Sequence, residues 1–123
     1  MLGFMVRGKL LVKDVGVQID INTETPSGAK VWFECKGSAL GERPGLKRTD
    51  SVKKAVADAF LVQPLGVPYV ILTSHLPDRG TNGWNMLHAA IARGACIVVC
   101  VNEPAHIKWL KAWMERPTMP VAS

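Results

Sequence analysis

The sequence predicts an α/β domain with a mixed β-sheet, in which an antiparallel hairpin adjoins crossover-connected strands and helices flank both faces of the sheet. The first observation is that apolar and polar residues alternate over 15–22 and 30–36, on either side of a turn signal. The second is that helical spacing alternates with short, continuous apolar runs in the second half of the chain, as in units with buried parallel strands. A length of 123 residues suits one domain over 1–123, with 117–123 as a loose tail.

The N-terminal third is expected to be strands. A strand at about 3–7 should turn at Gly8 into a long strand over 9–22. The turn signal is Thr25-Pro26-Ser27-Gly28, where proline sets φ and glycine permits a positive φ. A hairpin centred near Ser27 pairs positions whose numbers sum to about 54. That register places Asp20 opposite Glu34.

The second hairpin strand has two different faces. Val31, Phe33 and Cys35 form an apolar face, whereas Glu34 and Lys36 point the other way. Two carboxylates opposite each other on one face repel by up to about 1 kcal/mol. A divalent cation between them would replace this repulsion with binding, and oxygen ligands suit Mg²⁺ or Mn²⁺.

The rest of the chain alternates helices and strands. Helical spacing, capping residues and apolar runs predict the following elements in order: a helix over 51–63 capped by Thr49 or Asp50, a strand over 67–74, a helix over 84–93, a strand over 95–101 and a helix over 103–116. Polar loops over 37–46 and 75–83 separate them.

Asp20, a gap of thirteen residues and then Glu34-Cys35-Lys36 resembles the signature of the PD-(D/E)XK nuclease superfamily, which has the restriction-endonuclease-like fold. The order of elements after Lys36 is similar to that family over roughly residues 8–102. Members usually have a helix before the first strand, often with another acidic residue, and the hairpin here begins too early for one.

The resemblance implies a Mg²⁺-dependent deoxyribonuclease with Asp20, Glu34 and Lys36 as catalytic residues. The metal, for which Mn²⁺ should substitute, would be held by Asp20, Glu34 and the backbone carbonyl of Cys35. Lys36 would position or deprotonate the attacking water and offset charge on the phosphate. Asp14 is the alternative candidate for the first acidic residue of this signature. The alternatives are a solvated strand face with a weak Glu–Lys pair, or an inactive metal-binding relic.

Charge favours a polyanionic partner, since the formal net charge is +5. A basic segment beside the proposed site is expected to bind nucleic-acid phosphates, and its members are Gly37, Ser38, Arg43, Lys47, Arg48 and Lys53. The alternative is a solvated loop and helix face. A role of His75 in contacting DNA stays open.

The functional expectation is an endonuclease acting on DNA, and the alternative is a non-catalytic nucleic-acid-binding or scaffolding domain that retains the fold. A homodimer, or a partner in a larger protein or complex, would suit cleavage of two strands. The three cysteines, Cys35, Cys96 and Cys100, lie in apolar strand-like runs and are expected to be buried free thiols of a cytoplasmic protein. No membrane-spanning segment is expected.

Overall fold

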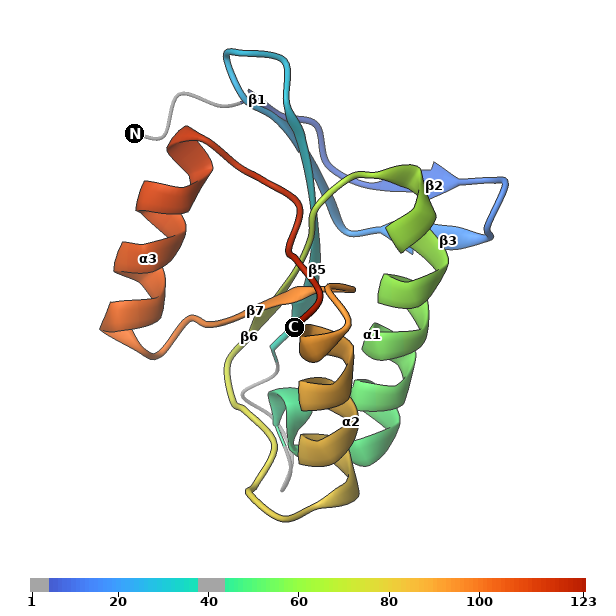
Figure 1. Cartoon of the computed structure of the whole chain (residues 1–123), viewed down its shortest axis with the longest axis vertical. Coiled ribbons are helices and arrows are strands. Elements are labelled where there is room, and N and C mark those ends of the chain that lie inside the picture. The colour runs from blue at the N-terminus through green and yellow to red at the C-terminus, as the bar shows by residue number, and fades with distance from the viewer. Residues whose placement is uncertain (1–4, 38–43) are drawn as a thin grey trace.

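The computed structural model describes residues 5–37 and 44–123 and centres on a five-stranded mixed sheet in the order β1-β4-β5-β6-β7 (Figure 1). Its strands are β1 (Met5–Val6), β4 (Ile21–Glu24), β5 (Lys30–Lys36), β6 (Tyr69–Thr73) and β7 (Ile97–Cys100). β4 runs antiparallel to β1 and β5, whereas β5, β6 and β7 are parallel. The predicted α/β class, with a hairpin joined to crossover-connected strands, is confirmed.

The predicted helices on both faces of the sheet are also confirmed. The helices in the described residues are α1 (Thr49–Val62), α2 (Asn82–Ala92) and α3 (Pro104–Glu115). α1 and α2 form the β5–β6 and β6–β7 crossovers and pack together on one face, while α3 covers the other (Figure 1). The N-cap of α1 is Arg48, without a side-chain capping bond, and not Thr49 or Asp50.

The prediction of one long strand over 9–22 is wrong. This segment contains β2 (Leu10–Val12), a turn over 13–16 and β3 (Val17–Ile19), which pair with each other as a separate antiparallel sheet. Gly16 adopts a φ of +69° in the turn, a conformation that glycine reaches without steric cost. Asp14, the alternative first acidic residue, is exposed in this same turn. Alternation of apolar residues fits a hairpin as well as one strand, which is why the pattern did not reveal the turn.

The predicted register of the hairpin between β4 and β5 is confirmed. Ile21 pairs with Phe33, and their numbers sum to 54. The turn is closed by bonds from the Thr25 N–H to the Ala29 carbonyl and from the Gly28 N–H to the Thr25 carbonyl. β4 begins directly after Asp20, where the chain passes from the small sheet into the large one.

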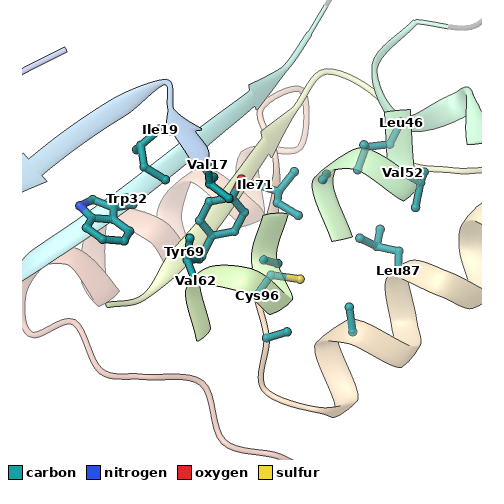
Figure 2. Packing of buried hydrophobic residues seen from close by; sticks show 14 residues of the cluster. Val17, Ile19, Trp32, Leu46, Val52, Val62, Tyr69, Ile71, Leu87 and Cys96 are labelled. Carbon is teal, nitrogen blue, oxygen red and sulfur yellow. The ribbon is translucent and has the colours of Figure 1, made fainter. Parts of the chain in front are cut away.

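Both faces of the large sheet are buried. The cluster under α1 and α2 includes Val17, Ile19, Trp32, Val62, Tyr69 and Ile71 (Figure 2), and the cluster under α3 includes Val31, Phe33, Val70, Val99 and Met114. The predicted alternation of β5 is therefore confirmed. Its Glu34, however, points into a buried face and not toward water.

The thiols differ in burial. Cys96 and Cys100 are buried as predicted, but Cys35, the last residue but one of β5, is exposed. Its pKa is nonetheless raised by partial desolvation and by the charges of Asp20 and Glu34.

The C-terminal segment 117–123 has no helix or strand, but it lies against the end of α2. The Ser123 N–H donates to the Ala92 carbonyl at 2.7 Å. A Cβ on Gly94 would lie 2.9 Å from the Pro120 carbonyl oxygen, so the close approach of the tail depends on glycine. Within the described residues, no helix has the length and apolar character that a bilayer-spanning segment needs.

Candidate active site

Asp20 lies at the bend between β3 and β4, and its carboxylate is fixed by the neighbouring strand. Its Oδ2 accepts a hydrogen bond from the Cys35 N–H at 2.8 Å. The backbone pairing of β4 with β5 ends at Ile21 and Phe33. Beyond this pair, the Asp20 carboxylate replaces a backbone carbonyl as the acceptor for β5. Asp20 and Glu34 are thus brought to the same end of the hairpin, as the register predicted.

Glu34 is a buried acidic residue with both carboxylate oxygens engaged. Only 4% of its surface is exposed. Oε2 accepts a hydrogen bond from the Tyr69 hydroxyl, and Oε1 lies 3.2 Å from Lys36 Nζ. The Lys36 side chain is 18% exposed, so this ion pair is screened far less than one on the surface. The alternative of a solvated strand face is therefore wrong for Glu34.

The electrostatics of Glu34 reflect this burial. Desolvation raises the pKa of Glu34 above its ordinary value, the Lys36 ammonium opposes that shift, and the negative charges of Asp58 and Asp20 add to it. Three acidic groups and one ammonium therefore influence one another at a single place.

Asp58, on α1, belongs to this cluster but is not among the predicted site residues. Its negative charge raises the pKa of Glu34, and burial raises its own pKa while Lys54 and Lys36 lower it. Helical spacing could have revealed it, because Asp58 lies three residues after Ala55 and four before Val62, which are both fully buried.

Tyr69 was also missed. It begins β6 and pairs with Trp32 in the parallel register, which places its side chain on the same face as Glu34. The continuous apolar run of β6 identified a buried strand but gave no sign of which face each residue would take.

The loop after the proposed site returns to the carboxyl end of β6. Leu46 lies in the 3-10 turn η1 (Gly45–Lys47), and its backbone N–H donates to the His75 carbonyl at 2.9 Å. The Thr73 hydroxyl lies 2.9 Å from the Lys36 carbonyl oxygen and 2.8 Å from the His75 carbonyl oxygen, and it can donate its one proton to either. A single buried threonine thus joins the end of β5 to the segment that carries the basic residues.

The described members of the predicted phosphate-contacting segment follow β5 and lead into α1. Gly37 directly follows β5 and is exposed, while Arg48 and Lys53 are exposed at the start of α1. Lys47 Nζ lies 3.7 Å from Asp78 Oδ1 in an exposed ion pair. The other two predicted phosphate contacts, Ser38 and Arg43, lie outside the described residues.

His75 follows β6. Its Nδ1 lies 2.8 Å from Ser74 Oγ, and its backbone N–H donates to the Thr73 hydroxyl. Neither bond assigns His75 a contact to DNA, so the predicted role of His75 stays a prediction.

The predicted magnesium ligands, Asp20, Glu34 and the Cys35 carbonyl, are oxygen donors of the kind that Mg²⁺ prefers. Over residues 5–37 and 44–123, no group of three or more His, Cys, Asp or Glu side chains is placed to hold a metal ion. Mg²⁺ usually takes only one or two carboxylates and keeps several waters. Asp20 and Glu34 supply two carboxylates, the Cys35 carbonyl lies on the backbone beside them, and Asp58 adds further negative charge.

Comparison with known proteins found no matching family model, curated protein or solved structure.

Proposed function

We propose that the chain is a Mg²⁺-dependent nuclease of the PD-(D/E)XK type that hydrolyses DNA phosphodiester bonds, with an endonuclease as the favoured form. The observation that carries the proposal is the buried Glu34 carboxylate, which is paired with Lys36 and lies at the end of the hairpin that presents Asp20. The mixed sheet and its helical crossovers agree with a restriction-endonuclease-like fold.

Burial distinguishes this site from an incidental ion pair. An exposed lysine–glutamate pair contributes about 0–1 kcal/mol and needs no explanation. Removing a carboxylate and an ammonium from water costs several kcal/mol per ion, and the attraction between them offsets this cost only in part. A chain that keeps Glu34 and Lys36 here, with Asp58 adding like charge, gains little stability from them, which favours a chemical use.

The bound cation would polarise the phosphodiester and lower the pKa of the attacking water. Asp20 and Glu34 would hold it, together with the Cys35 carbonyl. The Lys36 ammonium, whose Nζ is already 3.2 Å from Glu34 Oε1, positions the attacking water and stabilises the charge that develops on the phosphate. The exposed residues Gly37, Lys47, Arg48 and Lys53, with Ser38 and Arg43, contact flanking phosphates, and this contribution weakens as salt increases.

A second candidate is a non-catalytic nucleic-acid-binding or scaffolding domain. The observation in its favour is that Asp20 already has a structural use as the acceptor for the Cys35 N–H. In this case the basic segment would bind DNA equally well with and without a divalent cation.

Cleavage assays separate these functions. The purified protein is incubated with supercoiled plasmid and with branched DNA, in the presence of Mg²⁺, Mn²⁺ or EDTA, beside Lys36→Ala and Glu34→Gln. Lys108→Ala serves as a matched control, because Lys108 is exposed on α3 at the opposite face of the sheet. We expect metal-dependent cutting by wild type and Lys108→Ala, and none by the two site variants.

DNA binding without cutting by the wild-type protein would contradict the nuclease and support the scaffold. Measuring the size of the protein–DNA complex in the same samples tests whether a homodimer forms. A homodimer would suit cleavage of both strands.

A further inference from the structure

Tyr69 is the only tyrosine in the chain, and its hydroxyl reaches Glu34. The residue is 1% exposed. Figure 2 shows its ring in the cluster with Val17, Val62 and Ile71, so packing from three elements holds the ring in place.

The hydroxyl needs an explanation because the ring alone would fill this space. A buried phenol without a partner costs about 1–3 kcal/mol, whereas phenylalanine in the same volume carries no such cost. The Tyr69 hydroxyl meets Glu34 Oε2, and Lys36 approaches Oε1 from the other side. The two oxygens of the carboxylate are therefore distinguished by their partners.

We propose that Tyr69 is a positioning residue for the metal-binding carboxylate: it holds Oε2 of Glu34 and so presents Oε1, on the Lys36 side, to the cation. This inference rests on the proposed function. The parallel register of β5 and β6 supports this role of Tyr69. Trp32 pairs with Tyr69 and Glu34 pairs with Ile71, so Tyr69 lies on the same face as Glu34 and two residues away from it along the strands. The strand pairing thus fixes the backbone positions of both residues.

The expected consequence is a change in metal affinity. Groups that hydrogen bond to metal ligands orient them, and loss of such a group commonly weakens metal binding by about 10–100-fold. A hydroxyl with only a structural role would contribute to stability and leave metal affinity unchanged.

Tyr69→Phe and a matched control separate these roles. Thr23→Val also removes a buried hydroxyl from the sheet, since Thr23 is 1% exposed and its Oγ1 donates to the Val31 carbonyl at 2.7 Å, away from the site. Mn²⁺ binding is measured without DNA by titration calorimetry, and thermal unfolding of each protein is recorded. We expect Tyr69→Phe to weaken Mn²⁺ binding by about 10–100-fold and Thr23→Val to leave it unchanged, although both lower the melting temperature.

A second measurement uses the unsubstituted fold. Because the chain has one tyrosine, 3-fluorotyrosine labels position 69 alone. We expect its fluorine NMR signal to shift in a saturable way as Mg²⁺ is added. If Tyr69→Phe binds Mn²⁺ with wild-type affinity, the proposed role of Tyr69 is wrong. The same holds if the labelled protein binds Mg²⁺ and its fluorine signal does not shift. Neither result contradicts the proposed nuclease function. Absence of Mn²⁺ binding by wild type overturns the proposed function itself.

Discussion

Asp20 combines a structural and a proposed catalytic role, and two substitutions separate them. Asp20→Ala removes both the charge and the acceptor for the Cys35 N–H, whereas Asp20→Asn keeps an acceptor oxygen. The bond is 2.8 Å long and lies at an exposed strand end, so the lower part of the range for charge-assisted bonds applies, about 1.5 kcal/mol. A neutral acceptor is about half as strong, which leaves a loss of about 0.7 kcal/mol for Asp20→Asn.

These energies translate into melting temperatures. An unfolding entropy of about 2.1 cal/mol/K per residue over 123 residues makes 1 kcal/mol equal to about 4 °C. We therefore expect losses of about 6 °C for Asp20→Ala and about 3 °C for Asp20→Asn in scanning calorimetry. Cleavage should not follow this order. Both variants would lose the charge of a proposed metal ligand, and a loss of several kcal/mol of transition-state stabilisation would lower the nicking rate at least about 100-fold in each.

The proposed metal-binding role of Asp20 is refuted if Asp20→Asn nicks plasmid at the wild-type rate and Asp20→Ala loses nicking activity only in proportion to its lost stability. Asp20 would then be a strand-end acceptor and nothing more. Asp14→Asn is the matched control, because Asp14 is an exposed aspartate in the turn before β3. It should retain both the melting temperature and the nicking rate of the wild type.

Two further predictions concern stability. Since burial raises the pKa of Glu34, the folded state holds its proton at a pH where the unfolded chain has lost it, so the unfolding free energy of metal-free wild type relative to Glu34→Gln should fall as pH rises above the ordinary value of 4.5. Urea titrations from pH 4 upward measure this difference, and one that grows with pH would contradict the shift. Gly45→Ala should cost about 1–3 kcal/mol in urea unfolding, because φ is +61° and a Cβ would lie 2.7 Å from Thr73 Oγ1. Gly66→Ala, with φ +74° and open space around it, should lose less, and equal losses would argue against the close approach.

Local sequence patterns were sufficient to predict the elements that surround the site. The turn at 25–28 set the register of β4 and β5, and the alternation along β5 assigned its two faces correctly. Both are short-range signals, because a tight turn and a two-residue period leave few alternatives. The same two-residue period could not show that the chain changes sheets at Asp20, since a strand and a hairpin present the same alternation.

The partners of Glu34 were beyond such patterns. Tyr69 follows Glu34 by 35 residues, and Asp58 comes from a helix whose rotation is set by packing against the sheet. A tyrosine in an apolar run carries no pattern typical of a metal ligand or of a residue that positions one. Contacts of this kind depend on how elements meet, which no local period encodes.

The buried cluster argues for function because it departs from the rules that the rest of the sheet obeys. Immediately before Glu34, β5 fills its two faces with Val31, Trp32 and Phe33, and an apolar residue at position 34 would join Tyr69 and Ile71 without cost. The chain instead places an acid there, surrounds it with a tyrosine hydroxyl, an ammonium and a second acid from α1, and raises its pKa by burial. Such a conflict between local rules and the fold is typical of sites kept for chemistry. Under the proposed function, a divalent cation would relieve the repulsion between Asp20, Glu34 and Asp58 and leave Lys36 free to act on a phosphate.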